Sequence, residues 1–254
     1  VRRMLLTQKA FAEGGRALIY FATAQGDILT KSDDPEAREL ANHVLNFLTP
    51  IIKAFLTETG FEAANLGMQC FGGHGYINEW GVEQNVRDAR IAMLYEGTTG
   101  IQALDLLGRK VLGTRGKSLV PVTGFILDFC KRSRGRKELR PYLRELVRLT
   151  KQWKGLTRKI GFAAMRNRDA VGAASVDYIM FSGYVLLGVA WAASARAAYK
   201  RLDEGTKEEA FYRAKIQTAE FYFAKILPRT TSLLETMLAG PDPLMKLGEN
   251  EFMF

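Results

Sequence analysis

The spacing of apolar residues constrains the fold of this chain more than any other feature of its sequence. In the segment that follows Pro35, apolar side chains recur every three or four positions, at Leu40, Val44, Phe47, Ile51 and Ala54. This period describes one face of a bundle helix. No segment shows the alternating period of a strand. The sequence therefore predicts an all-α fold.

Helix boundaries in the first third of the chain follow from caps and breakers. A helix is expected over residues 4–25, where the paired glycines 14 and 15 indicate close helix packing. Asp34 and Pro35 predict the next helix start, with Asp34 as cap and Pro35 in the first helical position. We expect Pro50 to kink this helix. We expect Gly60 to separate it from a third helix that ends at the glycine pair 72 and 73.

A turn-rich segment, Gly113–Ser118, divides the chain. It ends in Gly-Lys-Ser as a phosphate-binding loop does, but that motif needs glycine at the position of Val111 and should follow a strand. We interpret the segment as a linker. It separates a four-to-five-helix up-down bundle over residues 1–114 from a second helical bundle over residues 115–254.

The second part reads as long helices, expected over about 121–133, 136–160, 163–203 and 207–238. One apolar stripe consists of Leu139, Leu143, Leu146, Leu149 and Trp153. The uncharged stretch 178–195 approaches membrane-spanning length, but its small residues favour a buried bundle helix and no membrane span. Pro228 should bend or stop the last helix.

Composition sets further limits. The chain is 47% hydrophobic, with a net charge of +9 that suits anionic partners, whether phosphate-bearing ligands, nucleic acid or an acidic membrane face. The separated Cys70 and Cys130 form no disulfide framework, which fits a reducing, cytoplasmic compartment. Two histidines without partners predict no metal site. Because the chain starts at Val1 within a helical pattern, we expect a fragment of a longer protein.

The stretch Arg87–Gln102 carries the strongest chemical signal, because Glu96 follows an apolar run and precedes Gly97. A carboxylate among apolar neighbours would be partly desolvated, which tunes it toward general-base work. The alternative is a solvated loop acid. Upstream, Arg87, Asp88 and Arg90 are expected to form a structural ion-pair group.

Two further local interpretations come from the residues alone. The glycines 72 and 73 favour a helix C-terminal cap, since that end of a helix repels phosphate. Thr99 and Gln102 fit a capping box, with Thr99 as the cap. Tyr76 and Trp80 are expected to be packing anchors of the intervening loop.

These motifs resemble the C-terminal end of the flavin-dependent acyl-CoA dehydrogenases. The resemblance is carried by Arg-Asp-Ala-Arg-Ile and Tyr-Glu-Gly-Thr around Glu96, and by Gln-Cys-Phe-Gly-Gly-His-Gly-Tyr at residues 69–76. The longer run from Glu96 to Lys110, with its C-terminal extension, resembles the subgroup that includes the methylmercaptopropionyl-CoA dehydrogenases. The match is strong over residues 1 to about 112, and only the general layout matches beyond.

The resemblance assigns roles that the residues alone do not. It implies that Glu96 is the catalytic base, and that Thr98 and Gln102 contact FAD. It further implies that Gln69, Gly72 and Gly73 line the FAD of a neighbouring subunit. A capping role and a flavin role for Gln102 conflict, so Thr98 is the firmer cofactor contact.

The resemblance also implies an activity and partners. An acyl-CoA would be oxidised to the trans-2-enoyl-CoA, with hydride passing to FAD N5 and electrons then to an electron-transferring flavoprotein. A homo-oligomer, dimer or tetramer, is expected, and the family's N-terminal helical and middle β domains lie outside this sequence. The alternative is an acyl-CoA dehydrogenase-like fold repurposed for nucleic-acid binding, suggested by the charge of +9. Acyl chain length and the role of the extension stay open.

Overall fold

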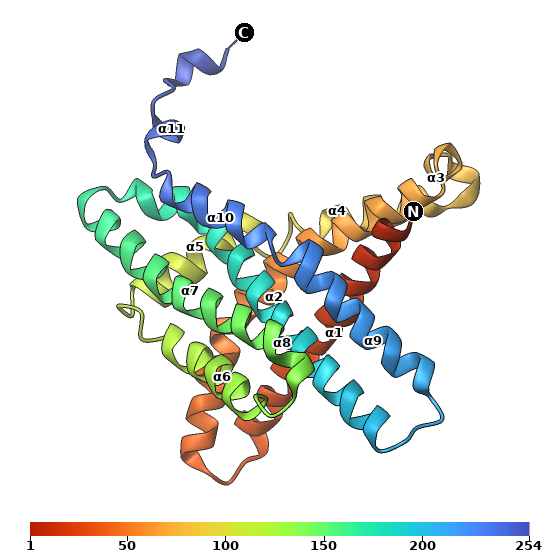
Figure 1. Ribbon diagram of the computed structural model, residues 1–254. Helices are drawn as coiled ribbons and strands as arrows, with labels where there is room; N and C mark the ends of the chain where they lie inside the picture. Colours follow the sequence, from red (N-terminus) through yellow and green to blue (C-terminus); the bar gives the residue numbers. More distant parts are fainter. Residues whose placement is uncertain (254) are drawn as a thin grey trace.

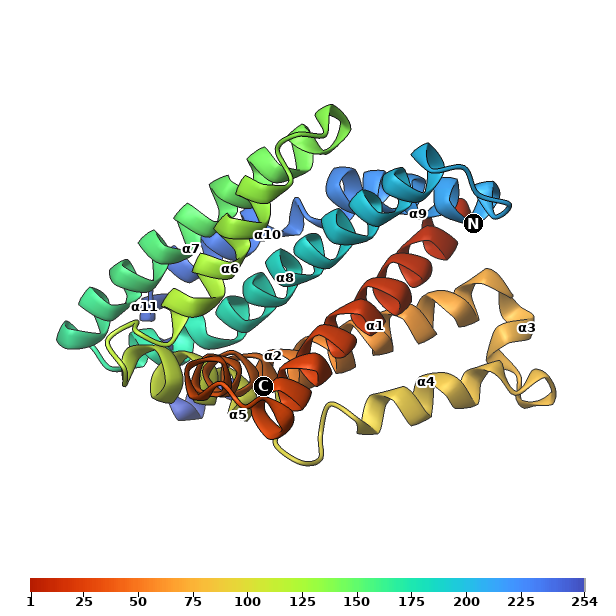
Figure 2. The ribbon, with the colours of Figure 1, turned by 90° about the horizontal axis from the view of Figure 1, so that it is seen from below.

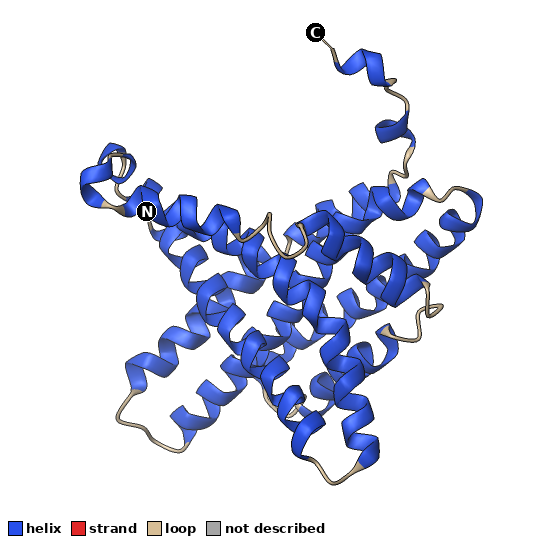
Figure 3. Ribbon diagram, turned by 180° about the vertical axis from the view of Figure 1, so that it is seen from behind, coloured by secondary structure: helices blue, strands red, loops and turns tan. Residues whose placement is uncertain are grey.

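The computed structural model describes residues 1–253, and within them regular structure is entirely helical (Figures 1 and 3). The all-α prediction is therefore confirmed. The α-helices are α1 Arg2–Lys31, α2 Pro35–Cys70, α3 Gly73–Tyr76, α4 Val82–Ile91, α5 Thr99–Leu104, α6 Leu119–Arg132, α7 Arg140–Arg166, α8 Asp169–Asp203, α9 Glu209–Phe221, α10 Arg229–Leu238 and α11 Asp242–Met245.

Helices α1 and α2 form a long hairpin (Figure 1). The predicted start of α2 is confirmed, because the Asp34 carboxylate accepts a hydrogen bond of 2.9 Å from the amide of Glu36. The predicted break at Gly60 is wrong, since α2 runs unbroken to Cys70. One glycine costs a helix only about 1 kcal/mol. Burial of Phe55 and Thr59 on the turn before it outweighs that cost.

Helix α2 also passes through Pro50. A proline removes the amide that would bond the carbonyl four residues earlier, here Asn46. The ammonium of Lys110, from the π-helical segment Asp105–Leu112, donates to that carbonyl instead. A side chain distant in sequence thus supplies the donor that Pro50 lacks.

The chain leaves the bundle after α2 and returns as α4, which runs back beside it (Figure 2). The excursion contains α3 and a 3₁₀ turn, Asn78–Trp80. Tyr76 and Trp80 are 75% and 57% exposed, so their expected role as packing anchors is wrong. The Trp80 ring lies 5.8 Å from that of His74, which belongs to the same excursion.

The extension supplies a central helix, α8. By length and composition α8 could cross a membrane, but 78% of its most apolar window is buried here, which favours the predicted bundle helix. All five residues of the predicted stripe are buried, with Leu139 in the 3₁₀ turn just before α7 and the other four in α7. The predicted break near residue 160 is wrong, because α7 continues to Arg166. The turn to α8 follows, where the Asp169 amide donates to Asn167 Oδ1 at 2.9 Å. Pro228 separates α9 and its π-helical end from α10, as predicted.

The two parts share one core. Phe47 of α2 lies 6.0 Å from the Trp153 ring of α7, and Phe55 packs edge-on against Tyr184 at 4.9 Å. The predicted close packing at the α1 glycines is confirmed, because a Cβ at Gly14 would stand 2.5 Å from Trp191 Nε1. Cys70 and Cys130 are free, and burial raises the pKa of Cys130 to about 11.

The last segment projects from the bundle (Figure 1). It contains α11 and a short 3₁₀ turn, and its Phe252 and Met253 are 63% and 76% exposed, as the sequence suggested. Phe254, the third apolar residue named with them, lies outside the described residues.

Candidate functional site

Glu96 lies in the loop between α4 and α5, where the backbone makes a tight turn with positive φ angles. Its φ is +54°, and that of Gly97 is +90°. Residues with a side chain rarely adopt the left-handed region, which costs about 1–3 kcal/mol and is held by the surroundings. The turn projects the Glu96 side chain out of the bundle, where it is exposed.

Three hydrogen bonds fasten this loop. Lys53 Nζ donates to the Gly97 carbonyl at 2.6 Å, and Gln102 Nε2 donates to the Glu96 carbonyl at 3.2 Å. Thr99 Oγ1 donates to Glu58 Oε1 at 2.6 Å. The backbone on both sides of the Glu96–Gly97 bond is therefore held by side chains of α2 and α5.

Lys53 and Glu58 were not identified as site residues from the sequence. Both belong to α2, in a mostly apolar stretch of the helix between Pro50 and Phe61. The sequence offered one signal that could have identified them, because a single cation and a single carboxylate stand out in such a stretch. Their partners lie more than forty positions away, so the pairing emerges only in the folded chain.

The expected capping box is wrong by one residue. Thr98 is the N-cap of α5, accepting a hydrogen bond of 3.3 Å from the Ile101 amide, while Thr99 turns to Glu58. Gln102 reaches the Glu96 carbonyl rather than the cap. A Cβ at Gly97 would stand 2.6 Å from Gln102 Nε2, so this glycine gives Gln102 its access.

Gln69, Gly72 and Gly73 lie at the far end of α2. A helix rises about 1.5 Å per residue, which puts Gln69 about 24 Å along α2 from Lys53 at the Glu96 loop. The structure therefore does not bring the two predicted groups together within one chain. Gly72 follows the helix end, with Phe71 as the C-cap residue, and its φ of +58° is one that favours glycine.

The ion-pair group expected upstream of Glu96 does not form among the described residues. Asp88 accepts a hydrogen bond of 2.7 Å from Gln84, and Arg90 lies 5.9 Å above the Phe61 ring. The described residues therefore contain no ion pair among Arg87, Asp88 and Arg90. Arg87, Asp88 and Arg90 are all exposed, so water solvates each charge.

The apolar residues beside Glu96 do not desolvate it in this chain. Ile91, Leu94 and Tyr95 are 53%, 50% and 51% exposed. An apolar surface of this kind around an exposed carboxylate is typical of a surface that another molecule covers. Within residues 1–253 no group of three or more possible metal ligands occurs. The loop thus offers one carboxylate at a fixed position, surrounded by exposed apolar side chains. Its described residues form no metal site that could act as an electrophile.

Comparison with known families divides the chain as the turn at residues 113–118 does. The family described as "Acyl-CoA dehydrogenase, C-terminal domain" matches residues 1–112. The family described as "Acetyl-CoA dehydrogenase C-terminal like" matches residues 122–248. The second match covers half of the chain.

Individual relatives cover nearly all of it. A broad-specificity linear acyl-CoA dehydrogenase of Mycobacterium tuberculosis is 33% identical over 99% of this chain and 43% of its own length. The 3-methylmercaptopropionyl-CoA dehydrogenase of Ruegeria pomeroyi is 38% identical over 89% of this chain and 38% of its own length. The chain thus spans about two fifths of the length of these relatives.

A solved structure supports the fold. The Caenorhabditis elegans protein ACDH-11, in complex with C11-CoA, superposes with a TM-score of 0.60 at 19% identity, over 84% of this chain and 34% of that one. Similarity at that identity concerns the helical architecture alone. The family matches over both parts of the sequence show that this chain belongs to the acyl-CoA dehydrogenase family.

Proposed function

We propose that the protein containing this chain oxidises an acyl-CoA thioester to the trans-2-enoyl-CoA, with Glu96 as the base. The observation that carries the proposal is the Glu96 turn: an exposed carboxylate at φ +54°, with its backbone held by Lys53 and Gln102. A base must stand at a fixed position relative to the proton that it removes. The names of the relatives, all acyl-CoA dehydrogenases, support the substrate class.

In the proposed reaction, the Glu96 carboxylate takes the proton from the carbon next to the thioester carbonyl. The backbone amide of Glu96 is proposed to donate to that carbonyl, which stabilises the negative charge that develops on its oxygen. Bound FAD would accept the hydride that leaves the neighbouring carbon. The apolar side chains beside Glu96 would exclude water once substrate and the rest of the protein cover them.

The glycine motif fits a flavin in a second location. At Gly72 and Gly73 no atom stands within 4 Å of the position that a Cβ would occupy, so the backbone is open to a flat ring. The exposed Gln69 amide can donate hydrogen bonds beside them. Because this group lies about 24 Å along α2 from the Glu96 loop, we propose that it serves the FAD of a neighbouring subunit. Thr98 and Gln102 would serve the FAD beside Glu96.

This arrangement requires a homo-oligomer. We propose that electrons then pass to an electron-transferring flavoprotein. The two free cysteines suit a reducing compartment, so we propose a cytoplasmic location. The nucleic-acid alternative has no support in the relatives, which are acyl-CoA dehydrogenases.

The test uses the whole protein, purified with its flavin, and a series of saturated acyl-CoAs under anaerobic conditions. Glu96→Gln should keep the flavin spectrum but lose the bleaching that substrate causes, by at least about a thousandfold in rate. Glu235→Gln, an exposed acid of α10, is the matched control and should bleach at the native rate. Near-native bleaching by Glu96→Gln would exclude Glu96 as the base.

A further inference from the structure

A groove lies between helix α1 and the extension helices α6, α8 and α9, away from the Glu96 loop. It consists of two adjoining cavities of about 270 Å³ and 320 Å³. Both are lined by Ala17, Ser194 and Ala197, so the two spaces lie side by side. None of the lining residues belongs to the Glu96 loop or to the Gln69–Gly73 segment.

The cavity beside α6, called the chamber below, has an almost entirely apolar lining and is partly open to solvent. The rings of Phe21 and Phe125, 4.7 Å apart, form part of its wall, and the small side chains of Ala190 and Ala193 leave the space open. Its hydroxyl group, that of Ser194, already donates to the Ala190 carbonyl at 2.9 Å. Protein interiors are otherwise close-packed, and a roomy space without free polar groups holds hydrocarbon better than water.

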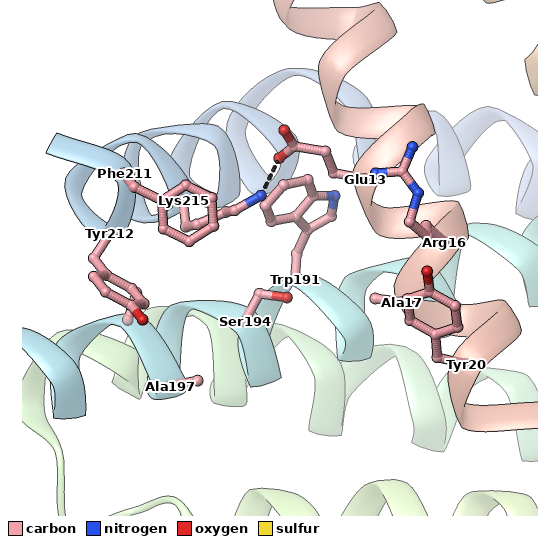
Figure 4. Close-up of a pocket in the computed structure, with 11 residues that line it drawn as sticks. Glu13, Arg16, Ala17, Tyr20, Trp191, Ser194, Ala197, Phe211, Tyr212 and Lys215 are labelled. Atoms are coloured by element: carbon pink, nitrogen blue, oxygen red, sulfur yellow. Dashed lines mark hydrogen bonds and ion pairs between the residues drawn. The ribbon is translucent and has the colours of Figure 1, made fainter. Parts of the chain in front are cut away.

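The cavity beside α9, called the mouth below, is lined by aromatic rings and charged side chains (Figure 4). Its walls include Tyr20, Trp191, Phe211 and Tyr212. The Glu13 carboxylate accepts from Lys215 at 2.8 Å and from Lys9 at 2.5 Å. Arg16 is exposed and has no hydrogen bond or ion pair with the part of the chain that the structure describes. The lining of the mouth therefore carries two cations, Arg16 and Lys215, against one carboxylate, Glu13.

We propose that this groove binds a medium-chain carboxylate, with its hydrocarbon chain in the chamber and its carboxylate at Arg16. The inference rests on the arrangement of side chains along the groove. The apolar chamber adjoins a mouth whose lining has a net positive charge. Arg16 can form a bidentate pair with a carboxylate. Binding of such a ligand by the groove does not depend on the dehydrogenase reaction proposed for Glu96.

The test is isothermal titration calorimetry of the native chain with sodium decanoate below its micellar concentration. One decanoate should bind per chain. Arg16→Glu should weaken binding at least about tenfold, because it replaces an attractive charge by a repulsive one. Ala193→Phe should abolish binding by filling the chamber. Decyltrimethylammonium, with the same chain and the opposite charge, should bind at least about tenfold more weakly than decanoate.

Matched controls lie on the exposed face of α7. Arg158→Glu and Ala163→Phe make the same chemical changes at exposed positions outside the groove and should bind decanoate as the native chain does. Glu96→Gln should also bind it normally, which separates this site from the proposed active site. Arg16→Glu is a surface change that should fold even if Ala193→Phe does not.

Three results would overturn the proposal. The first is absence of decanoate binding by the native chain, including the case in which the exposed C-terminal segment of a second copy fills the groove and gives a dimeric mass. The second is native affinity in the folded Arg16→Glu variant. The third is equal affinity for decanoate and decyltrimethylammonium, which would reveal nonspecific apolar binding.

Discussion

The guanidinium of Arg229 on α10 donates two hydrogen bonds of 2.7 Å to the carboxylate of Glu62 on α2. Arg229 also donates to the Tyr184 hydroxyl at 3.0 Å, so it joins α2, α8 and α10. Glu62 lies one helical turn beyond Glu58, which holds Thr99 near Glu96. The extension is thereby tied to the same helix that fixes the candidate catalytic loop.

Loss of the Arg229 pair should destabilise the fold moderately. The Arg229 and Glu62 side chains are 38% and 34% exposed, so solvent screening reduces the value of the pair. We expect Arg229→Met to lower the free energy of unfolding by about 1–2 kcal/mol, measured by urea denaturation. Lys225→Met, an exposed control close by in sequence, should change it by less than about 0.5 kcal/mol. Equal effects of the two changes would mean that the Arg229 pair adds no stability.

Lys110 and Pro50 should be energetically coupled through the Asn46 carbonyl. Lys110→Met removes the donor that bonds this carbonyl and should cost about 1 kcal/mol. Pro50→Ala restores a backbone amide on the turn, so Lys110→Met should cost less in that background. A double-mutant cycle by urea denaturation measures the difference. The same cost in both backgrounds would contradict the coupling.

Lys53 should act as a positioning residue in the proposed reaction. Its ammonium holds the Gly97 carbonyl at 2.6 Å, next to Glu96. In the whole protein, Lys53→Met should lower kcat about tenfold, or about 1.4 kcal/mol, with little change in KM or in bound flavin. Lys53→Arg should recover part of the rate, and Lys159→Met, an exposed control on α7, should have none of this effect. A change confined to KM would exclude a positioning role.

Acid should weaken the contact between α1 and α9. Burial raises the pKa of Glu13, but hydrogen bonds from Lys215 and Lys9 outweigh this and hold the pKa below the ordinary value of about 4.5. A carboxyl whose pKa is lowered by folding stabilises the fold above the unfolded-state pKa, and loses that effect as pH falls through the folded-state value. The native chain should therefore exceed Glu13→Gln in stability at pH 7 and lose this advantage below about pH 4.5.

Urea midpoints of both proteins between pH 7 and pH 3 measure this difference. Glu235→Gln, whose carboxyl is exposed on α10, should differ little from the native chain across the range. A Glu13→Gln difference that is constant with pH would contradict the electrostatic explanation.

The sequence by itself determined the helical class, the start of α2, the stop at Pro228 and the buried stripe of α7, because local caps and a regular apolar period act over a few turns. It also supplied the two motifs that link the chain to its family. It failed at Gly60, at the α7–α8 boundary and at the Thr99 cap. At Gly60, burial of neighbouring side chains outweighs the local free-energy cost of a glycine in a helix. At Thr99, the hydroxyl finds its hydrogen-bond partner, Glu58, elsewhere in the chain.

Only the tertiary structure decided how the candidate site is built. Lys53 and Glu58 meet the Glu96 loop because α2 and α5 pack together, and no local pattern encodes these pairings across more than forty residues. The solvent exposure of Glu96 likewise depends on which parts of the folded protein cover its apolar neighbours, and the local sequence does not determine that. Local sequence fixes where a helix turns, whereas packing between helices fixes which side chains hold that turn in place.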